Sequence, residues 1–149
     1  FKQKTAYEIR LSLVGSEMCI RDRGIFAALL VRAAKIDHEY TKQEQIEIES
    51  VIKNEFKVSD TEATKLRILG EQIEETTTDT VQLTREIKKE IPFDERKKLA
   101  ENLWSIILAD KFRSDEENSF MRTCIKLIGL SDIDSAMARN TVINRQETN

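Results

Sequence analysis

Apolar residues recur at helical spacing along most of the chain from Gly24 onward. In the stretch 25–36 they fall at positions i, i+4 and i+7 or i+8, which is typical of one face of an amphipathic helix. The same period returns over residues 41–56, 59–73, 81–91, 93–109, 114–128 and 131–149. Short polar connections join these segments and favour antiparallel packing of neighbouring helices around one core. The pattern therefore predicts an all-α fold, a single compact bundle of about seven helices.

The predicted helices begin and end at residues that favour helix termini. Three hydroxyl residues precede a glutamate by three positions, which is the spacing of a capping box. These pairs are Thr41 and Glu44, Ser59 and Glu62, and Ser114 and Glu117. Asp79 is a further candidate N-cap. Pro92 should end the helix before it, because helical geometry is disfavoured for the residue before a proline, and Gly129 should be a C′ residue.

The chain contains the pattern D-x-x-x-[ST]-x-x-E twice, 73 residues apart. Each copy lies between two apolar helical stretches. The matching residues are Asp37, Thr41 and Glu44 in the first copy and Asp110, Ser114 and Glu117 in the second. After a one-residue slip, residues 58–60 (VSD) also match residues 130–132 (LSD). A repeat of this length predicts two copies of a helix-loop-helix unit within one fold.

Four carboxylates occupy equivalent positions in the two copies: Asp37, Glu44, Asp110 and Glu117. If the two units pack about a pseudo-twofold axis, all four converge at one end of the bundle and form a candidate metal site. Ligands that are all oxygen atoms favour a hard divalent cation, Ca²⁺, Mg²⁺ or Mn²⁺, over zinc. The alternative needs no metal: the glutamates complete capping boxes, and the aspartates accept hydrogen bonds from loop amides.

Composition and motifs argue against several classes of function. The net charge is −3, with lysine and arginine scattered among acidic residues, which argues against binding to nucleic-acid phosphates. No apolar run approaches the roughly 20 residues that span a bilayer. The sequence has no Gly-rich phosphate loop, nucleophile elbow or C-x-x-C motif, so no catalytic residue is predicted and an enzyme is not expected. Counted from Asp37 or Asp110, the twelfth residue is Ile48 or Met121, so neither loop is an EF-hand.

Individual side chains outside the repeat are assigned structural roles. The basic residues at 88–89 and 96–98 flank Pro92 and should be solvated, whereas Trp104 falls on the core face of its helix. Cys124 lies on an apolar helix face, and the chain's two cysteines are too few for a disulfide framework, which indicates a reducing, cytoplasmic environment. The apolar positions of the last predicted helix are Ile133, Ala136 and Met137.

The first 23 residues differ from the rest of the chain. They have no clean helical or strand period, and residues 17–23 (EMCIRDR) resemble a translation of the transposon end used in DNA library preparation. Residues 11–13 fit the reverse complement of that end. A signal peptide is not expected, because a sufficient apolar stretch and a small-residue cleavage site are missing. We expect 1–23 to be a non-native segment upstream of a truncated native chain, with 24–149 as the helical domain; the alternative is a genuine N-terminal extension.

The paired motif and its flanks resemble the TerB family, which is named for tellurite resistance and is related to the N-terminal domain of a membrane-anchored DnaJ-like co-chaperone. The matching stretches are 27–44, 103–117 and 128–134, within a resemblance that covers residues 25–139. It implies a compact helical bundle with an acidic metal site at the four carboxylates. In one departure, this chain has His38 and Lys111 where the family usually has glycine after the aspartate.

The resemblance also implies a function. It indicates a non-enzymatic module in the response to metal or oxidative stress, acting through protein partners such as a membrane transporter or a chaperone complex. A divalent cation is the one cofactor that it implies. The alternative is a protein-interaction or scaffold domain, similar to the co-chaperone domain, with no metal. In either case we expect a cytoplasmic protein that reaches a membrane only through a partner.

Overall fold

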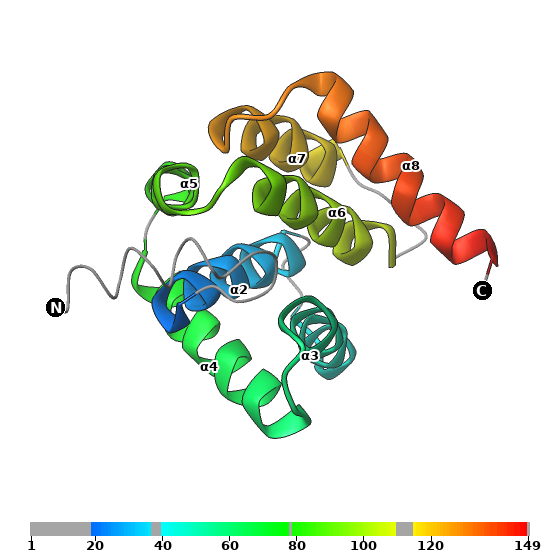
Figure 1. Cartoon of the computed structure of the whole chain (residues 1–149). Helices are drawn as coiled ribbons and strands as arrows, with labels where there is room; N and C mark the ends of the chain where they lie inside the picture. The colour runs from blue at the N-terminus through cyan, green and yellow to red at the C-terminus, as the bar shows by residue number, and fades with distance from the viewer. Residues whose placement is uncertain (1–18, 37–39, 78, 110–114, 149) are drawn as a thin grey trace, which may run out of the picture.

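The structure is a computed structural model that describes residues 19–36, 40–77, 79–109 and 115–148. Within these ranges it contains seven helices and no strand (Figure 1). They are α2 (Ile20–Ala34), α3 (Lys42–Phe56), α4 (Asp60–Thr76), α5 (Thr80–Glu90), α6 (Phe93–Ala109), α7 (Asp115–Leu127) and α8 (Asp132–Thr148). None of the described helices is long and apolar enough to cross a membrane. The predicted all-α bundle is confirmed.

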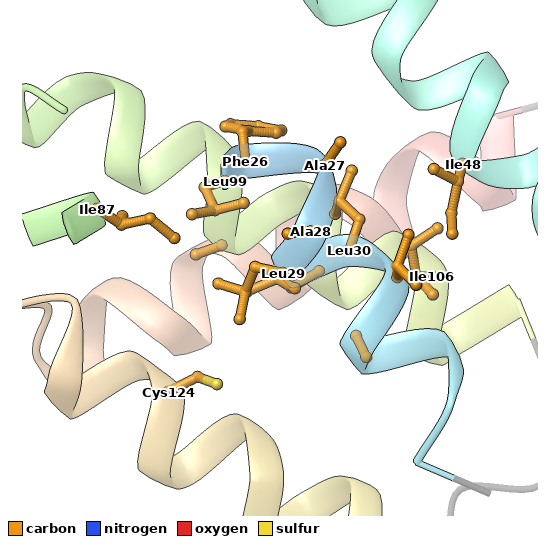
Figure 2. Close-up of a cluster of buried hydrophobic side chains, with 14 of the residues drawn as sticks. Phe26, Ala27, Ala28, Leu29, Leu30, Ile48, Ile87, Leu99, Ile106 and Cys124 are labelled. Atoms are coloured by element: carbon orange, nitrogen blue, oxygen red, sulfur yellow. The ribbon is translucent and has the colours of Figure 1, made fainter. Parts of the chain in front are cut away.

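Helix α2 runs through the middle of the bundle and is buried on nearly all sides. Every residue from 24 to 31 is buried, as are Ala33 and Ala34. Helices α3, α4, α5 and α6 surround α2, while α7 and α8 pack against α6 (Figure 1). Figure 2 shows side chains from α3, α5 and α6 around α2, among them Ile48 and Ile87. A helix that is apolar all round is typical of such a central position.

The two predicted helix-loop-helix units are confirmed, and their second helices end in the same backbone geometry. The residue after α3, Lys57, has φ 55°, and Gly129 after α7 has φ 82°, so both lie in the left-handed region. Two residues later, Ser59 and Ser131 accept hydrogen bonds as the N-caps of α4 and α8. The predicted cap at Asp79 is likewise present at the start of α5.

Gly129 is the C′ residue of a Schellman motif, as predicted. Its amide donates to the carbonyl oxygen of Lys126 at 3.1 Å, and the amide of Leu130 donates to that of Ile125 at 2.9 Å. Leu130 is buried, so the motif directs the chain back onto the core as α8 begins.

Arg96 differs from its predicted solvated position. Its Nε donates to the carbonyl oxygen of Ile91 at 3.0 Å, and its Nη1 donates to that of Ile128 at 2.6 Å. These carbonyls lie at the ends of α5 and α7, where helices leave acceptors without an intrahelical partner. Pro92 ends α5 as predicted, with Ile91 extended at φ −107° and ψ 125°. One guanidinium therefore joins the ends of two helices, which the position of Arg96 among other basic residues does not indicate.

The predicted apolar face of α8 is wrong. Ile133 and Met137 are 71% and 57% exposed, and Ala136 is exposed too, whereas Ala138 and Val142 are buried. Two faces of this helix carry apolar residues at helical spacing, so the period alone does not select one. Burial follows the face that joins the core: Ala138 and Val142 belong to the hydrophobic cluster, and α8 packs mainly on α6.

Helix α2 begins before the stretch predicted for it. Cys19 is its N-cap, and its Sγ accepts from the amide of Asp22 at 3.4 Å. Asp22 is buried, and the guanidinium of Arg23 lies 5.1 Å from the ring centroid of Phe56. Residues 20–23 therefore form the first turn of the central helix. The non-native origin of residues 1–23 stays a prediction.

Candidate functional site

The four carboxylates of the repeated motif divide between the described and the undescribed parts of the chain. Asp37, His38, Asp110 and Lys111 lie outside the described residues, as does Ser114. Glu44 and Glu117 are described, and each is the third residue of its helix, α3 or α7. The structure therefore gives the glutamates equivalent places in the two units. A carboxylate in the first turn is stabilised by the helix dipole in both cases.

Glu44 takes part in the predicted capping box, which is complete. Its amide donates to Oγ1 of Thr41 at 3.2 Å, and its Oε1 accepts from the amide of Thr41 at 2.9 Å. These two bonds satisfy amides that the start of α3 would otherwise leave without partners. One carboxylate oxygen of Glu44, Oε1, therefore accepts a hydrogen bond that stabilises the start of α3.

Glu117 is the more buried of the two glutamates, with a residue exposure of 6%. It is one of four buried polar or charged residues among those described, and it lies at the start of α7, beside core residues such as Met121 one turn later. A charged group in such a place requires compensating polar contacts. Its counterpart Glu44 is half-buried, so the two equivalent glutamates differ in exposure.

The described residues contain no group of three or more histidines, cysteines, aspartates or glutamates that would hold a metal ion. That part of the chain includes only the two glutamates of the candidate set, so the four-carboxylate site stays a prediction.

Two residues, one on each side of the segment 37–39, contact helix α4. On the N-terminal side, Nζ of Lys35 lies 2.7 Å from Oε1 of Glu74. On the C-terminal side, the hydroxyl of Tyr40 donates to Oε2 of Glu71 at 2.6 Å. Burial, followed by the hydrogen bond to Glu71, raises the pKa of the Tyr40 phenol well above its usual range, so it remains a donor at physiological pH. Successive turns of α4 therefore fix the chain before and after this segment.

Arg67 holds the acceptor of Tyr40 in place. Its guanidinium contacts Glu71 one turn along α4 and lies 2.6 Å from Oε2 of Glu49 on α3. These two carboxylates raise the pKa of Arg67, against the opposing effect of burial, so its charge is permanent. This network was not predicted from the sequence. The spacing of Arg67 and Glu71 is a visible signal for an i,i+4 pair, but nothing local indicates Tyr40 or Glu49 as partners.

Arg32 completes the polar contacts on this side of the bundle. Its side chain lies 3.3 Å from Oε2 of Glu74 and donates to the carbonyl oxygens of Glu74 and Thr77, at the end of α4. It thereby supplies donors to a helix terminus that carries no basic residue in its own last turn. Arg32 of α2 and Lys35, the C-cap residue that follows it, share Glu74, so the central helix and α4 are joined by charge as well as by apolar packing.

The fold and the repeated caps define a class: a helical domain built from two helix-loop-helix units around a buried central helix. The family model described as tellurite resistance protein TerB matches residues 25–140, and the chain belongs to the TerB family. No curated protein matches the chain, and no solved structure does.

Proposed function

We propose that this chain is a non-enzymatic TerB module of the metal and oxidative stress response, of the tellurite-resistance type, that binds a divalent cation through Asp37, Glu44, Asp110 and Glu117. The observation that supports it is the equivalent place of Glu44 and Glu117, each the third residue of the second helix in its unit. Both follow a D-x-x-x-[ST] segment in the sequence. An all-oxygen ligand set would favour Ca²⁺, Mg²⁺ or Mn²⁺.

Calorimetric titration of the full chain with each of these cations tests the proposal. Asp37→Asn with Asp110→Asn should abolish the binding heat. The matched control is Asp60→Asn with Asp132→Asn, a second pair of aspartates at equivalent positions of the two units, which should leave the titration unchanged. An unaltered titration in the Asp37 and Asp110 double variant would show that these aspartates are not ligands.

Glu44→Gln separates the capping role from cation binding. A glutamine at N3 still accepts from the amide of Thr41, so the melting temperature without cation should change little. At a cation concentration about 100 times Kd, binding should add about 2.7 kcal/mol to the stability of the wild type, and less to that of the variant. An equal cation-dependent rise in both proteins would exclude Glu44 as a ligand.

A second candidate function is a protein-interaction or scaffold module with no metal. It is supported by the complete capping box, which accounts for Thr41 and Glu44 without a cation. In this role the module would act in the cytoplasm on a membrane transporter or a chaperone complex, and would reach the membrane only through that partner. Melting temperatures that do not respond to Ca²⁺, Mg²⁺ or Mn²⁺ would favour this function over cation binding.

A further inference from the structure

A groove of about 440 Å³ lies between α7 and α8. One wall consists of Asn118, Met121, Arg122 and Ile125 of α7, and the other of Asp132, Ser135, Ala136 and Arg139 of α8. Each set has the spacing i, i+3, i+4, i+7, so each wall is two turns of one helix face, roughly 10 Å long. Trp104 of α6 lies at the base between them.

The base of the groove is apolar. Met121 and Ile125 are almost fully buried, and Trp104 is 7% exposed. The indole Nε1 of Trp104 donates to Oγ of Ser135 at 3.2 Å, which fixes the ring between α6 and α8. The guanidinium of Arg139 lies over this ring, 5.8 Å from its centroid, at the distance of a cation–π contact.

Two arginines face the groove from opposite walls. Neither Arg122 nor Arg139 forms an ion pair with a carboxylate of the described residues, whereas Arg32 and Arg67 both do. The acidic residue of the lining, Asp132, lies at the first position of α8, next to the turn. Because α8 runs away from the turn, Arg139 is two turns farther along the groove. Asp132 and Arg139 therefore lie at opposite ends of the α8 wall.

Apolar side chains continue from the groove onto the outer face of α8. Ile133 and Met137, with exposures of 71% and 57%, flank Ala136 of the groove wall on the helix surface. Isolated exposed apolar residues are common, but a contiguous strip beside a groove is typical of a contact surface. The strip lies next to Ala136, outside the groove, while Arg122 and Arg139 line the groove itself.

We propose that this groove binds an acidic, amphipathic helix of a partner protein. Apolar side chains at i and i+4 of that helix would lie over Trp104 and Ala136, and its flanking carboxylates would pair with Arg122 and Arg139. The helical spacing of both walls matches the helix-in-groove mode of recognition. Two arginines that form no ion pair with the described carboxylates favour acidic over basic partners. The proposal specifies a surface for the interaction role given above and rests on that role. It does not depend on the four carboxylates.

The fluorescence of Trp104 can report binding in the groove, because Trp104 is the only tryptophan in the chain. The probe is a capped helical peptide with leucine at i and i+4, glutamate at the flanking positions and no aromatic residue. Binding should change the emission of Trp104 saturably and should weaken as salt is added. A matched peptide with glutamine in place of glutamate should bind about tenfold more weakly, since the charge pairs are lost.

Variants of the protein locate the binding site. Arg122→Gln and Arg139→Gln should each weaken binding of the glutamate peptide about two- to tenfold. The matched control is Arg85→Gln, which removes an exposed arginine of α5 outside the groove and should leave the affinity unchanged. Calorimetry should accompany the fluorescence titration, because Arg139 contacts the reporter ring itself.

Several results would overturn the proposal. Equal affinity for the glutamate and glutamine peptides would show that the arginines do not select the partner. Wild-type affinity in the Arg122 and Arg139 double variant would place the peptide elsewhere, and an equal loss in Arg85→Gln would indicate a general charge effect. The same emission change with acetate alone would mean that the groove takes small anions. The cation titration does not depend on any of these results. A negative result for peptide binding in the groove can therefore be distinguished from a negative result for the metal site.

Discussion

Gly70 of α4 lies directly against Ala27 of the central helix α2. A Cβ placed on Gly70 would be 2.7 Å from the Cβ of Ala27 and 2.8 Å from its carbonyl carbon. The two helices thus cross with their backbones almost in contact, at a point where both side chains are small. This crossing brings Glu71 and Glu74 of α4 within reach of Tyr40, Arg32 and Lys35.

We predict that Gly70→Ala destabilises the protein although alanine is the better helix former. Alanine gains about 1 kcal/mol in helix propensity, but its methyl group would overlap backbone atoms that cannot rotate away, which costs about 1–3 kcal/mol. The net change is a loss, measurable by urea unfolding. Gly24→Ala is the control, since its methyl group would meet mainly the side-chain ends of Leu69 and Ile73, which can move. A smaller loss for Gly70→Ala than for Gly24→Ala would contradict the close crossing.

The equivalent turns after α3 and α7 predict opposite effects of substitution. Lys57 has a positive φ, so Lys57→Gly should raise the free energy of unfolding by up to about 1 kcal/mol. Gly129→Ala should lower the free energy of unfolding by more than about 1 kcal/mol. The alanine would be strained at φ 82°, and its Cβ would lie only 2.6 Å from Nη1 of Arg96. Thermal unfolding of both variants gives the two signs. Changes of the same sign would show that the two turns are not equivalent.

Arg96 should contribute far more to stability than its basic neighbours. Arg96→Ala leaves the carbonyl oxygens of Ile91 and Ile128 without their donors, and we expect a loss of about 1–3 kcal/mol. Lys98→Ala is the control, because Lys98 is half exposed and contacts Glu95 at 3.4 Å. Chemical unfolding curves for the two variants test the difference. Equal losses of unfolding free energy in the two variants would mean that the contacts of Arg96 with the helix ends do not stabilise the protein more than the contact of Lys98 with Glu95.

Glu95 gives the protein a pH dependence with an unusual sign. Burial raises the pKa of its carboxyl group, and Lys98 only partly opposes this. Its folded-state pKa therefore lies above the unfolded value, so its ionisation lowers stability as pH rises through the raised pKa. Glu95→Gln should stabilise the protein near pH 7, and this gain should vanish below about pH 4.3, where the carboxyl is protonated in both states. Asp94→Asn, at the exposed neighbouring residue, should give no gain at either pH.

Cys124 should be inert in the folded protein. Burial raises the pKa of its thiol to about 12, so the reactive thiolate is scarce at neutral pH. In a Cys19→Ser variant, reaction with Ellman's reagent should be slower by about 100-fold or more in buffer than in urea. Serine retains the N-cap position of Cys19, and the wild type provides an exposed thiol as an internal control. Rapid reaction of Cys124 in buffer would show that the core opens readily there.

The sequence alone was sufficient for features that depend on neighbours along the chain. The positions of the helices follow from the apolar period, and the caps at Thr41 and Ser59 follow from hydrogen bonds between residues three apart. The turn at Gly129 follows from the conformations that glycine tolerates. The same logic assigns Glu44 its structural role. It also relates Glu44 to Glu117, because a repeat preserves local geometry in both copies.

Features that join separate helices were decided only by tertiary structure. Burial of Ala138 in place of Met137 depends on which face of α8 meets α6, and both faces have helical spacing. Arg96 has acceptors 5 and 32 residues away, and Gly70 is constrained by a residue of α2. The groove exists because three helices converge on Trp104. Local sequence determines where a helix begins and ends, but the partner that a face meets is set by the packing of the whole chain.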